Sequence, residues 1–186
     1  MGNVMTFGKR ILFLSVLFCA LPVFAADQRS RGLDVYVIFD DSTMDSANRA
    51  EAVSWLCLTF IDRILQNGDR LVLCSARERP EILFNRTISG EDQKTEAKNL
   101  VRNISGGRGT VNYAAALRDA ARRNAEQRIA YTLLIGGAGM GVSQENDVAE
   151  LLRYSKTDNF PGWKIITIGL GVDSRAGSAA ASYMNR

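Results

Sequence analysis

Between residues 33 and 170, five short apolar runs follow one another, separated by longer and more polar or glycine-rich stretches. Each run is rich in β-branched or aromatic residues, which is typical of a buried β-strand. We therefore predict strands at 33–39, 71–74, 81–84, 129–135 and 163–170. The first strand stops at a polar cluster, 40–43, which predicts a loop directly after it.

The stretches between the strands carry helical patterns. In the stretch 46–66, six apolar residues recur at spacings of three and four and share one stripe of a helix, namely Val53, Leu56, Cys57, Phe60, Ile61 and Ile64. Gly68 then closes this helix. We predict further helices at 91–104 and 114–125, and another that Ser143 caps.

This alternation of strands and helices predicts an α/β fold. Strands that are apolar along most of their length pair in parallel, and right-handed crossovers then place helices on both faces of the sheet. The expected architecture is a doubly wound, mostly parallel sheet in three α/β/α layers. The sequence contains no internal repeat, and we expect a single domain at 26–186.

Residues 1–25 have the composition of an export signal. Lys9 and Arg10 precede the apolar run 11–21, and the last three residues give a small-x-small cleavage context. An uncleaved membrane anchor is the alternative, but the apolar stretch is shorter than the roughly 20 residues of a membrane span and is followed by Pro22. We expect this segment to be a cleaved signal peptide. The mature protein would then be periplasmic or secreted, with no stable membrane span.

Composition excludes several classes of function. The chain has no His, which rules out Ser-His-Asp triads, histidine general bases and His-ligated zinc sites. Its 23 basic and 20 acidic residues give a net charge of +3, and removing Lys9 and Arg10 with the signal leaves 21 against 20, or +1. A charge so near zero gives no affinity for nucleic acid. The acidic residues form no recognisable acid/base pair, so we expect that the protein is not an enzyme.

Cys57 and Cys74 are the thiols that remain after signal cleavage. Both occupy core-facing positions, at similar heights on a helix and on the strand that follows it. A helix packed on a sheet normally keeps Cα atoms beyond the bridgeable distance of about 7 Å, however. The sequence leaves two interpretations open, a disulfide in an oxidising compartment or two buried free thiols.

The glycine-rich turn 136–141 follows the fourth predicted strand. A phosphate cradle at a helix start is one interpretation of such a turn. The spacing does not fit the dinucleotide pattern GxGxxG, because Val142 stands where a glycine is needed, and no Walker lysine follows. A recognition loop is the better interpretation.

Four segments, taken in order, resemble those of one family of domains. They are the strand 33–39 with its loop Asp40-Asp41-Ser42-Thr43-Met44, the segment 106–117, the strand 132–135 before the glycine turn, and the closing strand 164–171. Together they are similar to the von Willebrand factor A family, whose fold is shared with integrin inserted domains. The resemblance covers nearly all of the mature chain and implies the same α/β fold.

This resemblance also implies a metal-ion-dependent adhesion site at the carboxyl edge of the sheet. Against the family pattern DxSxS, Asp40 and Ser42 stand at the first two ligand positions, and Thr110 lies in the region of the threonine ligand. Met44 stands at the second serine position, and Gly136 replaces the aspartate after the fourth strand.

These departures weaken the expected site. Mg²⁺ takes near-octahedral oxygen ligands, usually with one or two carboxylates, and only Asp40 matches such a position. Thr43 supplies the third loop ligand if the loop is one residue shorter, while counting back from the Ala-rich helix places Val111 in the threonine position. We expect no cofactor, and divalent cations to bind weakly or not at all. The alternative role for Asp40 and Ser42 is to cap the next helix or to bind water.

The resemblance implies an exported domain that binds another, extracytoplasmic protein. Its binding surface would be the rim, which we define as residues 40–45, 106–113 and 136–141 at the carboxyl edge of the sheet. The candidate partner-binding residues are Asp41, Thr43, Met44, Asp45, Tyr113 and Met140. Tyr113 and the two methionines have a second interpretation, as residues that pack inward beneath the loops.

Two competing functions use the same fold. One is a small-molecule or nucleotide-binding enzyme with Asp40 or Asp41 as the acid/base group. The other is a structural subunit of a cell-envelope assembly. The enzyme is not supported by a catalytic motif, since the chain lacks His and a nucleophile elbow. The structural subunit would have kept the fold and lost the metal.

Overall fold

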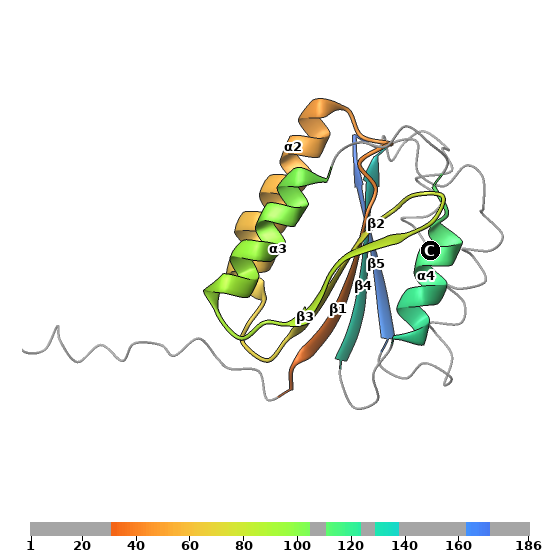
Figure 1. Ribbon diagram of the computed structural model, residues 1–186. Coiled ribbons are helices and arrows are strands. Elements are labelled where there is room, and N and C mark those ends of the chain that lie inside the picture. Colours follow the sequence, from red (N-terminus) through yellow and green to blue (C-terminus); the bar gives the residue numbers. More distant parts are fainter. Residues whose placement is uncertain (1–30, 105–110, 124–128, 138–162, 172–186) are drawn as a thin grey trace, which may run out of the picture. The chain divides into compact units, whose positions relative to one another are not determined.

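The computed structural model describes residues 31–104, 111–123, 129–137 and 163–171 (Figure 1). In chain order, their elements are β1 (Leu33–Phe39), α2 (Ser46–Ser54), η1 (Trp55–Ile64), β2 (Arg70–Ser75), β3 (Glu81–Thr87), α3 (Glu91–Asn103), α4 (Tyr113–Arg122), β4 (Ile129–Gly137) and β5 (Trp163–Leu170). The helix predicted after Ser143 lies outside the described residues. Within the described ranges, no helix has the length and apolar character needed to cross a bilayer.

The described strands form one sheet in the order β3-β2-β1-β4-β5. β1 pairs in parallel with β2 and β4, and β4 pairs in parallel with β5. β3 lies at the edge and runs antiparallel to β2, because the link from Ser75 to Glu81 is too short for a parallel crossover. The predicted α/β fold with a mostly parallel sheet is confirmed.

Alternate residues of β1 point to opposite faces of the sheet, and each face carries its own core. The odd-numbered residues from Leu33 to Phe39 pack with α2, η1 and α3. Tyr36 and Ile38 pack with α4 on the other face. Figure 1 shows the same arrangement, with α2 and α3 on one side of the sheet and α4 on the other. The helices therefore cover both faces, as the sequence predicts.

The helix predicted at 46–66 is present, but its hydrogen bonding changes along its length. α2 ends at Ser54, and a wider π-helix, η1, continues from there. The last bond of this segment runs from the N–H of Leu65 to the carbonyl of Phe60 (2.9 Å), a separation of five residues. Most of the predicted apolar stripe is retained, because η1 buries four of its residues, which are Leu56, Cys57, Phe60 and Ile61. The prediction is wrong for Ile64, which is 41% exposed, because the wider π-helical turn places Leu65 in the core instead.

Cys57 and Cys74 are free thiols that lie in different cores. Cys57 packs on the side of α2 and α3, whereas Cys74 packs on the side of α4. Similar height along the helix and the strand does not bring them together, since the Cys74 side chain leaves β2 on the opposite face. Of the two interpretations left open by the sequence, two buried thiols is the one found here. Burial raises the pKa of Cys74 to about 11.

Candidate functional site

The carboxyl ends of β1, β2 and β4 meet at one edge of the sheet, where the described part of the rim begins. Asp40 follows β1 directly, and its backbone N–H donates to the carbonyl of Ile135 in β4 (2.8 Å). The N–H of Ala76, after β2, donates to the carbonyl of Phe39 in β1 (2.9 Å). These bonds extend the strand pairing by one step and fix the start of the rim loop relative to the sheet.

The carboxylate of Asp40 is buried and receives four donors from its own chain. Its Oδ1 accepts hydrogen bonds from the backbone N–H (3.0 Å) and the hydroxyl (2.6 Å) of Ser42. Its Oδ2 accepts from the hydroxyls of Thr43 (2.9 Å) and Tyr113. A carboxylate offers about four lone-pair sites, so these donors fill its hydrogen-bonding capacity.

Thr43 joins this carboxylate to the end of β4. Its hydroxyl donates to Asp40 and also accepts from the backbone N–H of Gly137 (2.8 Å). The two backbones approach so closely that a Cβ on Gly137 would lie 2.0 Å from the carbonyl oxygen of Thr43. Only glycine fits this contact, which explains one of the residues in the glycine-rich turn.

The start of α4 is fixed by a second set of bonds. Asn112 caps the helix, because its side-chain oxygen accepts from the N–H of Ala115 (2.8 Å). The N–H of Asn112 donates to the carbonyl of Arg77 in the link between β2 and β3 (3.0 Å). Tyr113 is the first residue of α4, so these bonds hold its ring in place beneath the rim loop, where its hydroxyl reaches Asp40.

Asp41 is also buried, but it has a different environment. Its Oδ2 accepts no hydrogen bond in the described part of the chain and lies 3.9 Å from Nε of Arg49. Burial raises the pKa of Asp41, and the charges of Arg49 and Arg77 are among the influences that oppose this rise. Nη2 of Arg49 also donates to the carbonyls of Arg102 (3.5 Å) and Ile104 at the end of α3. One guanidinium therefore links α2, the rim loop and α3.

The structure brings Asp40, Ser42 and Thr43 together and gives the other loop residues different roles. Met44 is half-buried and packs against the core beneath α2. Asp45 is exposed and caps α2, since its Oδ1 accepts from a backbone N–H in the first turn (2.8 Å). Asp40 and Ser42 therefore do not cap the next helix, which was their alternative predicted role. Asp45 caps it instead, because the loop continues past Asp40 and Ser42 before the helix starts.

The remaining candidate site residues are either buried or outside the described residues. Asp41 and Tyr113 are 6% and 4% exposed, so neither presents a free side chain to a partner. Tyr113 instead begins its helix and packs inward, which was its second interpretation. Val111 is buried in the same core. Thr110 and Met140 lie outside the described residues.

Arg49 and Arg77 are charged residues of this edge that the sequence analysis did not single out. Arg49 contacts carbonyls 53 and 55 positions further along the chain. Arg77 stands in a short link between two strands, and its Nε donates to the hydroxyl of Ser75 (3.3 Å). The contacts of Arg49 have no local sequence signal, because they depend on how distant elements pack, whereas that of Arg77 spans only two positions.

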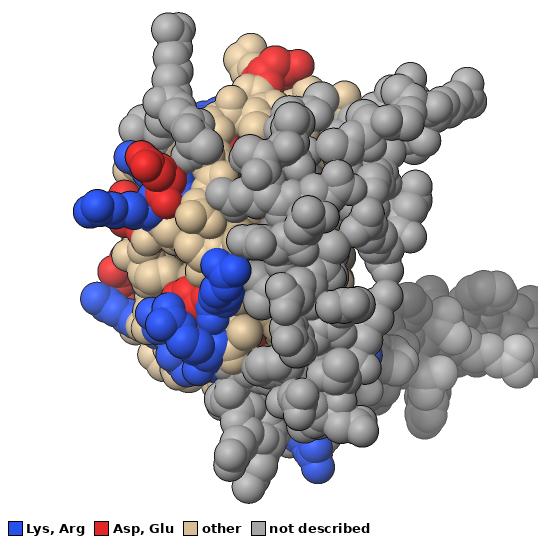
Figure 2. Space-filling view, turned by 90° about the vertical axis from the view of Figure 1, so that its right-hand side faces the viewer, with Lys and Arg blue, Asp and Glu red and all other residues tan. Residues whose placement is uncertain are grey.

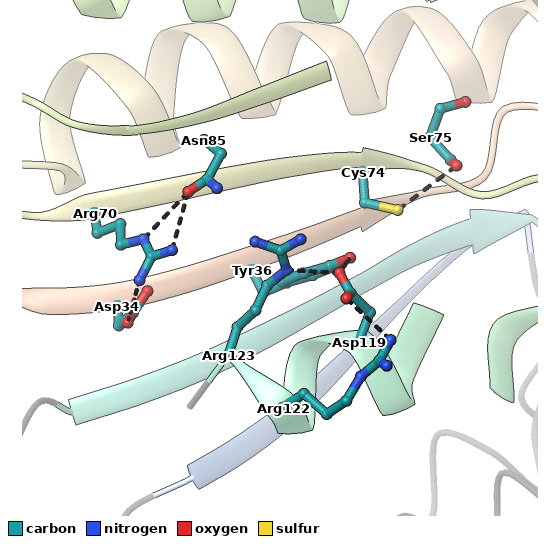
Figure 3. Close-up of polar contacts among 9 residues, drawn as sticks. All are labelled: Asp34, Tyr36, Arg70, Cys74, Ser75, Asn85, Asp119, Arg122 and Arg123. Carbon is teal, nitrogen blue, oxygen red and sulfur yellow. Dashed lines mark hydrogen bonds and ion pairs between the residues drawn. The ribbon is translucent and has the colours of Figure 1, made fainter. Parts of the chain in front are cut away.

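A second polar cluster joins the middle of β1 to α4 (Figure 3). The hydroxyl of Tyr36 donates to Oδ2 of Asp119 (2.9 Å), and Nε of Arg123 donates to the same oxygen (2.7 Å). Arg122 donates to the other oxygen (3.3 Å). Burial acts to raise the pKa of Asp119, but the hydrogen bonds from Arg123 and Tyr36 outweigh it and hold this pKa below its usual range. The cluster is an anchor for α4.

Beside this anchor lies a cavity of about 10 Å³, whose lining includes Tyr36, Arg123 and Trp163. This volume holds about one water molecule, so an organic ligand does not fit. On the described part of the face seen in Figure 2, basic and acidic side chains lie next to each other, not in a field of one sign. Such a surface does not favour nucleic acid.

Comparison with known proteins identifies the fold family. The chain matches the family described as von Willebrand factor type A domain over residues 33–179. Among solved structures, it is similar to a von Willebrand factor type A protein from Catenulispora acidiphila, at 15% identity and a TM-score of 0.57, covering 75% of this chain and 33% of that chain. It is also similar to an aerotolerance-related membrane protein from Bacteroides fragilis, at 17% identity and a TM-score of 0.56, covering 75% and 68%.

A third similar structure is proximal thread matrix protein 1 from the mussel byssus with a zinc-occupied MIDAS motif, at 19% identity and a TM-score of 0.52, covering 77% of this chain and 38% of that chain. Identities this low indicate a shared fold alone. The chain spans about a third of the length of the first of these structures. A comparison with curated proteins found no match. Because the family match covers most of the sequence, the chain belongs to the von Willebrand factor type A domain family.

Proposed function

We propose that this domain binds another protein through the rim, and that binding needs no divalent cation. Adhesion and protein interaction are typical of the family, which supports the first part. The carboxyl edge of a parallel sheet is also where open α/β folds hold their ligands. We further propose that residues 1–25 direct export, that the partner is extracytoplasmic and that the domain is not an enzyme.

The hydrogen bonding of Asp40 carries the second part of the proposal. Both carboxylate oxygens accept from protein donors, and two of these donors are the hydroxyls of Ser42 and Thr43. A bound cation would require lone pairs that Tyr113 and the loop already engage. The phenol and the loop hydroxyls thus give this buried charge the partners that a metal ion would otherwise supply.

The other family ligand positions add little to a cation site. Val111 contributes a buried apolar side chain, and Gly136 contributes none. The Asp41 carboxylate lies beside Arg49 instead of completing a site with Asp40. In the described ranges, no three Cys, Asp or Glu side chains form a cluster that could hold a metal ion. Among the described residues of the rim, these contacts support a site that holds no divalent cation, while Thr110 lies outside the described residues.

Exposure separates the residues that can touch a partner from those that support the rim. Ser42 and Asp45 are exposed, and Met44 is half-buried. Asp41 and Tyr113 lie beneath them and fix the loop. A partner would therefore meet a short polar loop with one apolar side chain, on a base that is already ordered. Preordered loops lose less entropy on binding.

The test is capture of proteins from the native envelope by the purified mature domain. Captured proteins are identified by mass spectrometry, and the Kd of the purified partner is then measured with and without EDTA. We expect the same Kd in both conditions. Met44→Ser should weaken binding about tenfold, whereas Leu58→Ser, which alters a 53% exposed residue on η1, should not.

Two outcomes would contradict the proposal. Loss of wild-type binding in EDTA would restore a metal-dependent mechanism. Equal binding by Met44→Ser and Leu58→Ser, with both variants folded by circular dichroism, would place the interface elsewhere.

A further inference from the structure

The helix that follows the rim loop ends in a register that its apolar pattern does not predict. In an α-helix, the N–H of Leu65 would donate to the carbonyl of Ile61, four residues back. Instead it donates to the carbonyl of Phe60 (2.9 Å), so the helix ends in a π-helical turn. Leu65 is therefore 1% exposed, whereas Ile64, which the α-helical pattern places on the core stripe, is 41% exposed. Two neighbouring apolar residues thus compete for one core position.

The next α-helical hydrogen bond is replaced by two contacts from outside the helix. In an α-helix, the N–H of Gln66 would donate to the carbonyl of Asp62. Here that N–H donates to Oδ2 of Asp69 (2.8 Å), and that carbonyl accepts from Nζ of Lys94 in α3 (3.0 Å). Asp69 and Lys94 are both buried. The two contacts stabilise the π-helical end, because an α-helical end would have to give both of them up.

Polar contacts, not apolar burial, decide between the two registers. Burying Ile64 in place of Leu65 changes the apolar area in the core very little, because the two side chains are isomers of the same size. The π-helical end gains hydrogen bonds to the charged groups of Asp69 and Lys94, whereas the α-helical end gains a bond between two neutral backbone groups. Bonds to charged groups are the stronger kind, so the free domain favours the π-helical end.

This helix connects its far end to the rim. α2 and η1 are continuous, and α2 begins directly after Asp45 of the rim loop. The helix lies beside α3 (Figure 1) and contacts it at both ends. Near the rim, Arg49 donates to the carbonyl of Ile104, and at the far end Nζ of Lys98 lies 2.6 Å from Oδ1 of Asp62. A π-helix is wound more widely than an α-helix, so a change of register between these two contacts moves the rim loop relative to α3.

We propose that the helix at 46–66 is a switch with two registers. In the second register it is α-helical to its end, Ile64 replaces Leu65 in the core, and Lys94 releases the carbonyl of Asp62. We expect about 1–10% of the free domain to occupy this register. Partner binding at the rim then changes the balance between the registers. This last consequence rests on the proposed function, whereas the existence of two registers does not.

Thiol labelling of the mature domain tests which residue is exposed. Ile64→Cys and Leu65→Cys each introduce one thiol, and the rate of its reaction with a maleimide is followed by mass spectrometry. Cys57 and Cys74 are buried and serve as slow internal references. We expect the thiol at position 64 to react at least tenfold faster than that at position 65. Adding Lys94→Met, which keeps an apolar side chain of similar length but removes the donor, should lower this ratio at least tenfold.

The matched control is Lys98→Met on the same helix. It removes the bond to the carboxylate of Asp62 (2.6 Å) but leaves the carbonyl bonded to Lys94, so it should change the ratio less than twofold. No change in Lys94→Met, or equal changes in the two lysine variants, would overturn the inference. If Lys94→Met does not fold, NMR relaxation dispersion of the wild type decides. Millisecond exchange at the amides of Leu65 and Gln66 is then expected, and flat profiles would overturn the inference.

The Kd of the partner captured from the envelope separates the switch from the proposed function. If Lys94→Met changes both the labelling ratio and this Kd, the latter by about fivefold or more, the switch and its effect on the rim are supported. If the ratio changes and the Kd does not, while Met44→Ser still weakens binding, the proposed function stands and the effect on the rim is wrong. If the ratio changes and neither variant alters the Kd, the two registers stand and the proposed function fails.

Discussion

The phenol hydroxyl of Tyr113 donates a hydrogen bond to Oδ2 of Asp40 across 73 positions of sequence. Asp40 follows the end of β1 and Tyr113 begins α4, so this bond fastens a helix to the edge of the sheet. The same oxygen accepts from Thr43, whose own hydroxyl accepts from Gly137 at the end of β4. Three segments of the carboxyl edge are therefore connected through one carboxylate.

Tyr113→Phe tests this connection. Removing the hydroxyl deletes a buried bond to a charged group, which should lower the free energy of unfolding by about 1.5–3 kcal/mol. Urea denaturation at pH 7 measures the change. The matched control is Tyr131→Phe on β4, since this half-buried residue pairs with Val35, far from the strand end that leads to Asp40, and the change should cost less than about 0.5 kcal/mol. Equal losses in the two variants would mean that the Tyr113 hydroxyl contributes nothing special.

Titration with divalent cations tests the proposed metal independence. A ligand that binds only the folded state raises the melting temperature through the term RT ln(1 + [L]/Kd). We expect no saturable rise with Mg²⁺, Mn²⁺ or Zn²⁺ up to millimolar concentration, because the lone pairs of Asp40 are engaged. A saturable rise that disappears in Asp40→Asn would show that the site binds metal after all.

The anchor at Asp119 predicts how stability responds to acid. The pKa of this group is lower in the folded state than in the unfolded chain, where it is about 3.9. The ionised form therefore stabilises the fold at every pH above that unfolded value, and the stabilisation is lost as pH falls through the lower folded pKa. The difference in unfolding free energy between wild type and Asp119→Asn should be constant from pH 7 to about 4.5 and shrink below about 4.

Urea denaturation at a series of pH values measures this difference. The companion variant Tyr36→Phe removes one of the hydrogen bonds that hold the pKa down. Without this bond the folded-state pKa of Asp119 should rise, so the stabilisation by its carboxylate should be lost at a higher pH than in the wild type. A difference between wild type and Asp119→Asn that stays constant down to pH 2 would contradict the prediction.

Periodicity was sufficient to predict the strands and most of the helices. The β-branched runs identify β1 and β5 with their bounds. β1 is buried along its whole length, as its continuous apolar run predicts, whereas β5 ends the described sheet and is only partly buried. The stripe through η1 was also visible, although the change to π-helical bonding was not. That change depends on how individual turns fit the core, which residue spacing does not encode.

The site was predicted less completely than the fold. Asp40 and Ser42 could be found because they follow a strand in a known pattern. The inward position of Tyr113 depends on the residue at which α4 begins, and Asn112 sets that point through its cap. Arg49 could not be found, since its partners lie on α3 and become neighbours only after the helices pack.

Gly137→Ser tests whether the close approach of β4 to the rim loop is needed. A Cβ at this position would lie 2.0 Å from the carbonyl oxygen and 2.6 Å from the carbonyl carbon of Thr43. Backbone atoms cannot turn aside as a flexible side chain does, so the loop would have to shift. The hydrogen bond that the N–H of Gly137 donates to the Thr43 hydroxyl would then lengthen. We expect the free energy of unfolding of the variant to fall by about 1–3 kcal/mol, the usual cost of overpacking.

The matched control is Gly90→Ser at the start of α3. Its backbone is extended, with φ of 171°, and the nearest atom to an added Cβ is the side-chain oxygen of Gln93 at 3.9 Å. Serine is also a good helix cap, so this variant should be neutral or slightly stabilising. Because the rim loop rests on Gly137, the first variant should also weaken partner capture under conditions where it remains folded, and the control should not. Normal stability and normal capture in Gly137→Ser would mean that the loop can move away from β4 at no cost.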